Sequence, residues 1–398
     1  MQQLYNAFYQ QLNRVSVDFK RYLFNDINWN SRLIAITGSR GTGKTTLLLQ
    51  HIKLNEAQHL DEVLYVSLDN LWFSTHTLLD LVDAFAKRGG KRLYLDEVHF
   101  YKGWSRELKN SYDSYPDLKI IFTGSSLLEI HKGEVDLSRR LINYTLYGLS
   151  FREYIEYEYG FKFDVFNIEE ILSNHVQLSL MVAAKLKPLV AFQEYLRIGY
   201  FPYYKEDKEL YHLKLMQTLN TIFEKDLPAI ESIDYHSIVK IKKLFSIIST
   251  MVPYTPNVSQ LSRDVGTTRT SLLNYLHYLE KANALSMLSK DAFGIKQMAK
   301  PEKVFIGNTN YAFALGGDQT NIGSVRESFF MNQMNVRNRV EFSENVDFVV
   351  SGKYNMEIGG KNKTKKQISG LEDAYIVVDD IETGYGKQIP LWLMGFTY

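Results

Sequence analysis

The residues with the most definite chemistry in this chain are eight consecutive ones, Gly38-Ser39-Arg40-Gly41-Thr42-Gly43-Lys44-Thr45. They fit the pattern Gly-x-x-x-x-Gly-Lys-Ser/Thr, which builds a loop whose backbone N–H groups surround a chain of phosphates. We expect Lys44 to reach the β- and γ-phosphates of ATP and the Thr45 hydroxyl to ligate Mg²⁺. Arg40 and Thr46 belong to the loop and to the helix after it, so they also lie close to phosphate. The sequence therefore predicts an ATP and Mg²⁺ site at residues 38–46.

A second chemical signal is the pair Asp96 and Glu97, which closes the apolar segment 92–97. Asp96 is expected to hold the magnesium, directly or through water, and Glu97 to polarise the attacking water as a general base. A solvated strand end is the alternative explanation of the pair. His99 follows closely, and a packed, hydrogen-bonded histidine is favoured there over one that orients Glu97.

Polar residues further along the chain are candidates for contact with the transferred phosphate. Ser125, after the apolar segment 118–123, is expected to contact the γ-phosphate or the attacking water, with Thr123 as second choice. A helix N-cap at Ser125 or Ser126 is the alternative. Arg140 is expected to stabilise the transferred charge, in its own subunit or in a neighbour's. A surface ion pair fits Arg140 equally well.

Three further segments must position these residues. Residues 32–37 precede the loop as a buried parallel strand would, and residues 46–52 continue after it with helical apolar spacing. A strand candidate at 63–68 lies between the loop and Asp96. Such an additional strand, with a glutamate beside the aspartate, marks the branch of P-loop proteins that hydrolyses ATP rather than the kinases and GTPases. The predicted fold is an α/β domain with a parallel P-loop sheet.

The bulk composition narrows the class of protein. With 398 residues, 45% apolar and 23% charged, the chain is long enough for two or three globular domains. A net charge of +1 gives no global case for binding nucleic acid or an anionic membrane. The lack of cysteine excludes disulfides, thiolate catalysis and cysteine-based metal sites. No apolar run reaches roughly 18 residues and the start lacks a signal-peptide pattern, so a cytoplasmic protein without a membrane span is expected.

The sequence resembles a family of prokaryotic AAA-like ATPases whose members carry a C-terminal domain related to restriction nucleases. Tyr200 departs from the family pattern, where a second glycine is usual. The resemblance implies an ATPase domain, a helical and winged-helix region and a nuclease-like α/β domain, which we place at 1–160, 161–295 and 296–398. Most physiological roles in the family are unassigned. The segments that carry the resemblance are 36–48, 95–97, 122–126, 136–140, 149–154 and 195–202.

A glycine turn separates two short helices expected in the middle region. Residues 258–265 are predicted to form a helix that stops at Gly266, and Thr267 or Thr268 caps the next one. This is a helix-turn-helix, expected to be winged. Few residues here are basic, and winged helices also serve as packing modules, so contact with DNA stays open. The side chains that would reach a groove are Arg269, Thr270, Ser271 and Asn274.

Three carboxylates in the C-terminal region have the arrangement of a restriction-type nuclease site. Glu327 lies on an expected helix, Asp347 on a strand and Glu357 on its expected hairpin partner. Together they can bind Mg²⁺, which would activate water against a phosphodiester. The nuclease pattern expects a lysine where Gly359 stands, and Lys361 is the nearest substitute. Without a positive group there, the negative charge that develops on the scissile phosphate in the transition state is poorly stabilised.

The same region carries a local run of positive charge. Five lysines stand between residues 353 and 366, against Glu357 alone. These lysines could bind the phosphate backbone of a nucleic acid even if the domain does not cleave it. Alternatively, they lie on a solvated hairpin edge and prevent it from pairing with another strand. A competent nuclease, a non-cutting nucleic-acid binder and a purely structural domain therefore all stay open. The lysines are Lys353, Lys361, Lys363, Lys365 and Lys366.

The function that these residues favour is Mg²⁺-dependent ATP hydrolysis driving a conformational or assembly change that acts on DNA. Two other functions stay open: a slow ATP-dependent regulatory switch that binds protein partners, and an ATP-regulated DNA endonuclease. DNA, a protein partner and self-association are all compatible with the sequence. Whether Arg140 acts within its own subunit depends on the oligomeric state.

Overall fold

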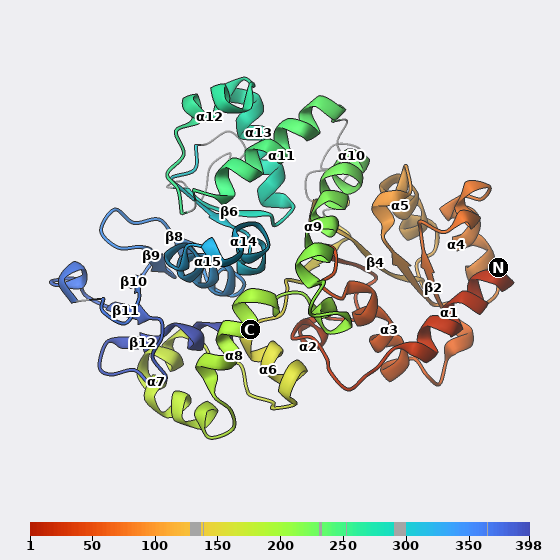
Figure 1. Ribbon diagram of the computed structural model, residues 1–398. Helices are drawn as coiled ribbons and strands as arrows, with labels where there is room; N and C mark the ends of the chain where they lie inside the picture. Colours follow the sequence, from red (N-terminus) through yellow and green to blue (C-terminus); the bar gives the residue numbers. More distant parts are fainter. Residues whose placement is uncertain (128–136, 138, 231–232, 252, 290–299, 364) are drawn as a thin grey trace. The chain divides into compact units, whose positions relative to one another are not determined.

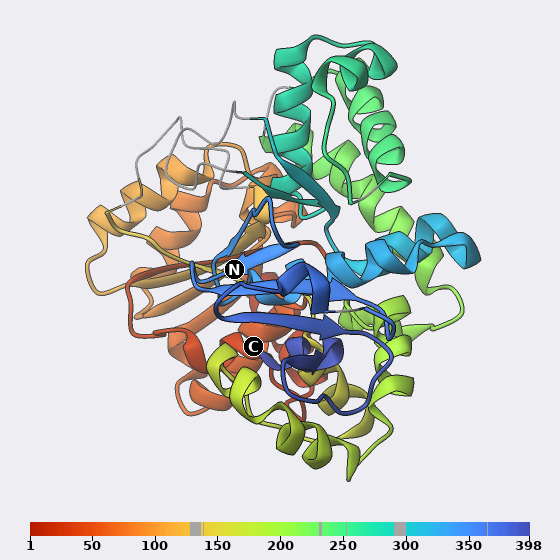
Figure 2. The same ribbon diagram turned by 90° about the vertical axis from the view of Figure 1, so that its left-hand side faces the viewer.

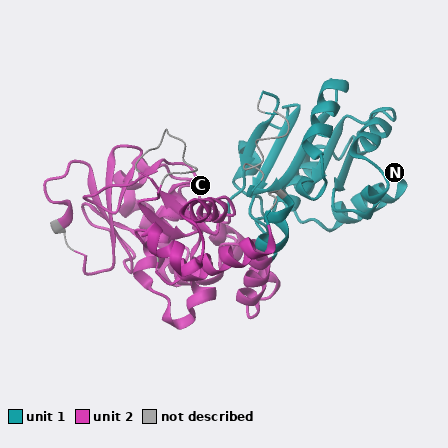
Figure 3. Ribbon diagram, turned by 90° about the horizontal axis from the view of Figure 1, so that it is seen from above, with its two compact units in different colours: residues 1–147, 221–233 teal, residues 148–220, 234–398 magenta. Residues whose placement is uncertain are grey.

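The computed structural model describes residues 1–127, 137, 139–230, 233–251, 253–289, 300–363 and 365–398. It divides into two compact units, which are coloured separately in Figure 3. Unit 1 comprises residues 1–147 and 221–233, and unit 2 comprises residues 148–220 and 234–398. The chain therefore passes between the units three times, and residues 221–233 are a short excursion into unit 1.

Unit 1 is built on a parallel five-stranded sheet with the strand order β2-β3-β4-β1-β5, of which β2 and β4 are labelled in Figure 1. Strand β1, which leads into the phosphate loop, is buried along its whole length, as expected for an apolar strand covered on both faces. Because the strands are parallel, the residues that follow their carboxyl ends meet at one edge of the sheet. The strands are β1 (Leu33–Gly38), β2 (Val63–Ser67), β3 (Arg92–Asp96), β4 (Lys119–Ser125) and β5 (Ile142–Thr145).

The helices of unit 1 begin at residues whose type explains the start. The helix after the phosphate loop begins at Lys44, directly after the left-handed Gly43. Another begins after a capping box in which Thr77 and Asp80 each accept a hydrogen bond from the other's backbone N–H. The helices are α1 (Gln2–Arg14), α2 (Leu23–Asp26), α3 (Lys44–Asn55), α4 (Leu78–Ala86) and α5 (Trp104–Ser114), with 3₁₀ turns η1 (Leu60–Glu62), η2 (Leu71–Ser74) and η3 (Val98–Phe100).

A continuous helical run carries the chain into unit 1 for the second time. Helix α9 (Tyr211–Thr221) continues without a break into a π-helical turn, η6 (Ile222–Asp226), and then into α10 (Leu227–Ile230). Within η6 the side chains of Ile222, Phe223 and Asp226 are buried, and α10 contacts η3. Turns of π-helix are rare in proteins, and those that occur are often found at functional sites.

Helices dominate the first part of unit 2. The first of them begins with a capping box formed by Ser150 and Glu153, both buried. Its Phe151 ring meets Phe192 and Trp392 edge to face. The helices are α6 (Phe151–Tyr159), α7 (Ile168–Ala183), α8 (Pro188–Ile198) and α11 (Tyr235–Ser249), with the 3₁₀ turn η5 (Pro202–Glu206).

The two helices predicted around a glycine turn are present. Helix α12 (Val258–Val265) ends at Gly266, whose φ of 75° is in the left-handed region that glycine adopts without strain. Helix α13 (Arg269–Lys281) is capped by Thr268, whose hydroxyl accepts a hydrogen bond from Ser271 N–H at 3.1 Å. The cap is therefore Thr268 and not Thr267.

A two-stranded antiparallel sheet follows the helix pair. Strand β6 (Leu285–Leu288) pairs with β7 (Lys303–Ile306), and Tyr254 forms a further bridge to Val304. We predicted that β7 opens the C-terminal domain, but its backbone hydrogen bonds go to β6 and it closes the helical region. Residues 296–299, where the C-terminal domain was predicted to begin, lie outside the described residues.

The last part of unit 2 is a mixed sheet with the order β12-β11-β10-β9-β8, drawn in blue in Figures 1 and 2. Strands β10, β11 and β12 are parallel, and β8, β9 and β10 are antiparallel. Tyr354 pairs with Val350, so β9 and β10 form the expected hairpin. The strands are β8 (Val340–Glu341), β9 (Phe348–Val350), β10 (Tyr354–Gly359), β11 (Ala374–Val378) and β12 (Gln388–Pro390), and the helices are α14 (Thr309–Gly316), η8 (Gly317–Gln319), α15 (Ile322–Met334), η9 (Lys365–Ile368) and η10 (Leu391–Phe396).

The two units divide the chain differently from the three predicted ranges 1–160, 161–295 and 296–398. Helix α6 belongs to unit 2 because it packs on α8 and η10, whereas residues 221–233 belong to unit 1. The parallel sheet and the helical middle are present as predicted, and the C-terminal region contains a mixed sheet. Within the described part of the chain, no helix combines the length and the apolar character needed to span a membrane.

Candidate nucleotide-binding site

The phosphate loop connects β1 to α3 at the carboxyl edge of the parallel sheet. Gly41 and Gly43 have φ angles of 85° and 96°, which turn the backbone in a way that glycine permits at little cost. Lys44 is 5% exposed, and its Nζ donates hydrogen bonds to the carbonyl oxygens of Gly38 at 3.0 Å and Ser39 at 3.1 Å. The ammonium group is therefore held over the loop, where the motif places the phosphates.

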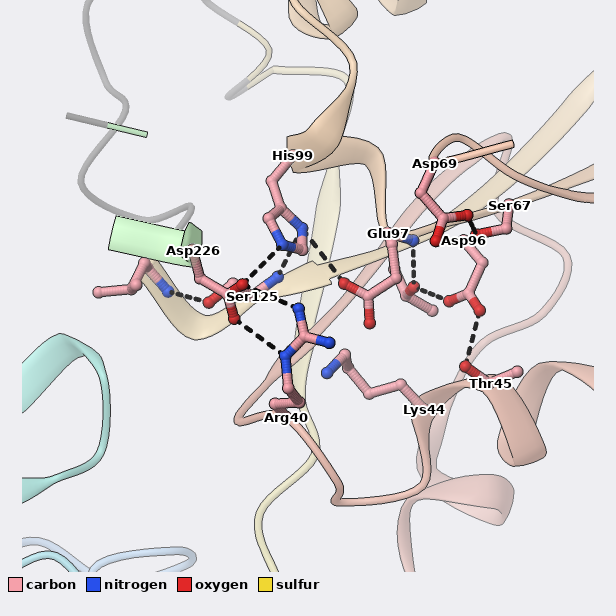
Figure 4. A network of polar contacts seen from close by, with 12 residues as sticks. Arg40, Lys44, Thr45, Ser67, Asp69, Asp96, Glu97, His99, Ser125 and Asp226 are labelled. Carbon is pink, nitrogen blue, oxygen red and sulfur yellow. Dashed lines mark hydrogen bonds and ion pairs between the residues drawn. The ribbon is translucent and has the colours of Figure 1, made fainter. Parts of the chain in front are cut away.

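The Asp96 carboxylate, at the end of β3, accepts hydrogen bonds from three hydroxyl groups (Figure 4 shows two of them). Thr45 Oγ1 donates at 2.6 Å, Tyr65 Oη at 2.7 Å, and Thr123 Oγ1 donates to the other carboxylate oxygen. Burial and the nearby Asp96 charge raise the pKa of Tyr65 far above its ordinary value, so this hydroxyl remains a donor. The oxygens of Thr45 and Asp96 fit a Mg²⁺ ion, which prefers hard oxygen ligands.

Glu97 has an unusual backbone conformation. Its φ of 54° and ψ of 46° lie in the left-handed region, which a non-glycine residue adopts only when its surroundings impose it. Its N–H donates to Thr123 Oγ1 at 3.0 Å, and its side chain is 21% exposed. The carboxylate therefore reaches solvent beside the buried Asp96, as the predicted general base would need to do.

The two residues predicted to sense the phosphate have different contacts. The Ser125 hydroxyl accepts a hydrogen bond from Leu127 N–H at 3.3 Å, which is the capping contact given above as the alternative. The Ser125 N–H donates to Nδ1 of the buried His99 at 3.4 Å. Thr123 is the residue whose hydroxyl touches both Asp96 and the backbone of Glu97. A contact of Ser125 with phosphate stays a prediction.

Asp226 belongs to the site but no sequence motif indicated it. Its carboxylate receives two hydrogen bonds from the Arg40 guanidinium, Nη2 to Oδ1 at 2.8 Å and Nε to Oδ2 at 3.3 Å (Figure 4). Asp226 is 2% exposed. Burial would raise the pKa of Asp226, but His99 and Arg40 outweigh it and hold the pKa below its ordinary value. The carboxylate is therefore charged at neutral pH and paired with the phosphate loop.

Arg140 forms the surface ion pair that was its alternative explanation. Its Nε lies 3.0 Å from Asp113 Oδ1 on α5, and its guanidinium lies 5.8 Å from the ring centroid of Tyr112. Its predicted role in stabilising transferred charge stays a prediction. Of the segment 136–140 that carried part of the family resemblance, Asp136 and Ser138 lie outside the described residues.

In unit 2, the three acids predicted for a nuclease site lie near one another and form ion pairs with lysines. Lys303 Nζ lies 2.6 Å from Glu327 Oε2 and 3.5 Å from Asp347 Oδ1, and Lys363 Nζ lies 2.6 Å from Glu357 Oε1. Burial raises the pKa of Glu327, with Lys303 lowering it and the two other acids raising it further. Among the described residues, no group of three acidic or histidine side chains is placed to hold a metal ion. The site does not fit a metal as it stands.

The lysine that meets Glu357 is Lys363 and not the predicted Lys361. Three carbons of the Lys363 side chain lie 2.6–2.7 Å from where a Cβ at Gly359 would be, so glycine leaves the space that this side chain crosses. Lys361 is exposed in the turn after β10. Lys353 lies over the ring of Tyr354, 4.7 Å from its centroid.

Two stretches of the chain match known domain families. Residues 30–155 match the AAA domain, and residues 190–317 match a domain of unknown function, DUF8612. The first match contains the phosphate loop, the pair Asp96 and Glu97, and Ser125. The chain therefore contains an AAA P-loop domain of the ATPase class, as the sequence predicted.

One curated relative and several solved structures are similar to parts of the chain. An uncharacterized protein of the archaeon Methanocaldococcus jannaschii is 30% identical over 300 residues, which are 71% of this chain and 62% of that protein. The chain thus spans about three fifths of the length of this curated relative. AMPPCP-bound DnaA from Aquifex aeolicus is similar at a TM-score of 0.29 and 18% identity, over 70% of this chain and 87% of that one. PCH-2 from C. elegans is similar at a TM-score of 0.24 and 15% identity, over 69% and 64%. Structural similarities of this strength carry no information on function.

Proposed function

We propose that the protein binds ATP with Mg²⁺ and hydrolyses it, and that hydrolysis drives a conformational or assembly change acting on DNA. The observation that carries the ATPase part is the 2.6 Å hydrogen bond between Thr45 Oγ1, next to the phosphate loop, and Asp96 Oδ2 at the end of β3. These are the two oxygen ligands that a P-loop enzyme offers to magnesium, and Lys44 stands beside them.

Each residue of the site has a distinct role in this proposal. Thr45 and Asp96 would hold Mg²⁺, which would supply positive charge to offset that of the phosphates. Lys44 would exchange its two loop carbonyls for phosphate oxygens. Glu97 would accept a proton from the attacking water, because its carboxylate follows Asp96 directly and is partly exposed. Thr123 would fix both acids through its single hydroxyl group.

The substitution Glu97→Gln tests the ATPase part. Glutamine keeps the size and the backbone conformation but cannot accept the proton, so kcat for ATP should fall by about 10²–10⁴-fold. Binding of a fluorescent ATP analogue should stay within about threefold of the wild type. Glu62→Gln, which changes a surface ion pair of the same unit with Lys91, is the matched control and should retain turnover. Normal turnover by Glu97→Gln would exclude Glu97 as the base.

The helix pair α12–α13 supports DNA as the target. A hollow of about 390 Å³ is lined by Arg269 and Lys300 together with the first residues of α12. Two cations and the positive end of a helix suit the phosphate backbone of a nucleic acid. The remaining lining residues are Thr255, Pro256, Asn257, Val258 and Ser259.

The DNA part is tested by titrating steady-state ATP hydrolysis with single-stranded and duplex DNA. We expect a several-fold rise that saturates and weakens as salt is added, because phosphate contacts release counterions. The double variant Arg269→Ala, Lys300→Ala should lose the rise, and Lys162→Ala, an exposed lysine elsewhere in unit 2, should keep it. A flat, slow rate with every DNA would instead favour the ATP-dependent switch that binds protein partners.

The proposal does not extend to DNA cleavage. A metal-dependent nuclease needs carboxylates free to bind the ion, whereas Glu327, Asp347 and Glu357 are already compensated by Lys303 and Lys363. The cluster has the charges of an ion-pair network within the chain.

A further inference from the structure

The carboxylate of Asp226 is placed at the nucleotide site by a segment far away in the sequence. Arg40, in the phosphate loop, and Asp226 are 186 residues apart, yet they form a two-point ion pair within unit 1. Paired contacts of this kind between a guanidinium and a carboxylate fix orientation as well as distance. The hydrogen bonds therefore define where the Arg40 side chain points, at the mouth of the loop that receives phosphates.

His99 extends the contact from Asp226 towards the predicted base. Its Nδ1 accepts the Ser125 N–H at 3.4 Å, so in the neutral ring the proton belongs to Nε2. Nε2 lies 3.9 Å from Asp226 Oδ1, and Nδ1 lies 3.4 Å from Glu97 Oε2. The ring, 1% exposed, is thus enclosed between the two carboxylates, with the proton-bearing nitrogen towards Asp226 (Figure 4).

The chain around Asp226 connects this arrangement to unit 2. Asp226 is the last residue of the π-turn η6, which continues helix α9 without a break. The flanking residues 148–220 and 234–398 belong to unit 2. A change in how residues 221–230 pack at the nucleotide site therefore changes the end of a helix that belongs to the other unit.

We infer that Asp226 is a positioning residue of the ATPase site, which holds Arg40 and His99 in place and makes ATP turnover depend on the docking of residues 221–230. The inference rests on the proposed ATPase function and names a means of its regulation. Asp226 acts through Arg40 and His99, and Glu97 remains the residue that meets the water.

The physical basis is the cost of leaving a buried charge without its partner. If residues 221–230 undock, Arg40 loses the anion that orients it and His99 loses the carboxylate that faces its Nε2. The geometry of the ATPase site therefore depends on the docking of the segment that carries Asp226.

The test compares the wild-type chain with Asp226→Asn, Glu224→Gln and Glu97→Gln. Glu224 is an exposed acid on the same π-turn and serves as the matched control. Asparagine keeps the shape at position 226 but removes the charge. For Asp226→Asn we expect kcat for ATP to fall roughly tenfold to a hundredfold, less than for loss of the general base itself. Binding of a fluorescent ATP analogue should change by no more than about threefold, so the effect is on turnover.

The outcomes separate the inference from the proposed function. If Glu97→Gln turns over ATP normally, the ATPase assignment fails and the inference fails with it. If Glu97→Gln is inactive while Asp226→Asn equals Glu224→Gln and wild type, the ATPase stands and the inference is wrong. Arg40→Gln combined with Asp226→Asn should lose no more turnover than the more damaged single variant, because the two side chains act as one unit. Additive losses would contradict action through Arg40.

Amide hydrogen exchange tests the same inference in a variant that retains Asp226. In Arg40→Gln, the amides of residues 222–230 should exchange faster than in wild type. The amides of α11, the next long helix in the sequence, should exchange at the wild-type rate. Equal exchange of residues 222–230 in the two proteins would overturn the inference, even if Asp226→Asn failed to fold.

Discussion

Asp96 in unit 1 and Glu357 in unit 2 are almost equally buried, at 3% and 2% exposed, but their partners differ in charge. Asp96 accepts hydrogen bonds from the hydroxyls of Thr45, Tyr65 and Thr123. Glu357 is paired with the ammonium of Lys363 at 2.6 Å. Hydroxyl groups satisfy the lone pairs of a carboxylate and leave its charge, whereas an ammonium group cancels that charge.

The comparison shows that burial of an acid does not reveal its use, and that the charge of its partners does. A carboxylate among hydroxyls still attracts a divalent cation, so Asp96 is suited to chemistry. A carboxylate already paired with lysine attracts a cation much less, and its removal leaves the lysine without a partner. On this basis the site in unit 1 is expected to affect turnover and the cluster in unit 2 to affect stability.

The strongest challenge to this comparison is the substitution Asp96→Asn. Turnover of ATP should fall by about 10²–10³-fold or more, because the amide does not replace the charge that holds the magnesium. The free energy of unfolding should change by less than about 1 kcal/mol, since an amide can still bond with the surrounding hydroxyls. Steady-state kinetics and denaturant unfolding measure the two quantities. A large loss of stability with intact turnover would reverse the assignment of this acid.

The second challenge is Glu357→Gln, for which the opposite pattern is expected. The free energy of unfolding should fall by about 2 kcal/mol, less than the 3–5 kcal/mol of a fully buried pair because Lys363 is partly exposed. Turnover of ATP should be unchanged. Lys361→Gln, two residues from Lys363 but exposed, is the matched control and should shift stability by less than about 0.5 kcal/mol. If Mg²⁺ raised the melting temperature of wild type but not of Glu357→Gln, the cluster would be a metal site after all.

The smallest expected effect is the pH dependence that Glu327 gives to stability. Burial raises its pKa above the ordinary value of 4.5, so the folded chain binds this proton more readily than the unfolded chain. Its contribution to stability is therefore largest at low pH and is lost as the pH rises from 4.5 through the raised pKa. Compared with Glu327→Gln, wild type should lose stability over that interval in unfolding curves measured at successive pH values. Parallel curves would remove Glu327 from the set of buried, charge-coupled acids.

The site in unit 1 was largely predictable because its determinants are local. The spacing of Gly38, Lys44 and Thr45, and the pair Asp96 and Glu97 at the end of an apolar strand, indicate backbone geometry and chemistry together. The strand predicted between the loop and Asp96 is also present, as β2. Local signals also predicted the glycine turn of the helix pair and the hairpin that carries Glu357.

What escaped prediction depends on contacts between distant parts of the chain. Asp226 carries no motif, and only folding brings it to Arg40. Strand β7 pairs with β6 and not with a strand of the C-terminal sheet. The residues of β7 do not by themselves indicate which of these partners it takes. Lys363 was overlooked in favour of Lys361 because the path of the turn after Gly359 sets which lysine returns to Glu357, and sequence distance does not.

The left-handed backbone of Glu97 implies that protein stability and activity select different residues at this position. A non-glycine residue in this conformation costs roughly 1–2 kcal/mol, and glycine relieves most of that cost. A library of variants screened only for resistance to heat should therefore enrich glycine at position 97, whereas a screen for ATP turnover should retain glutamate. Because of this strain, the substitution that most increases stability at position 97 would also remove the carboxylate that is proposed to act as the base.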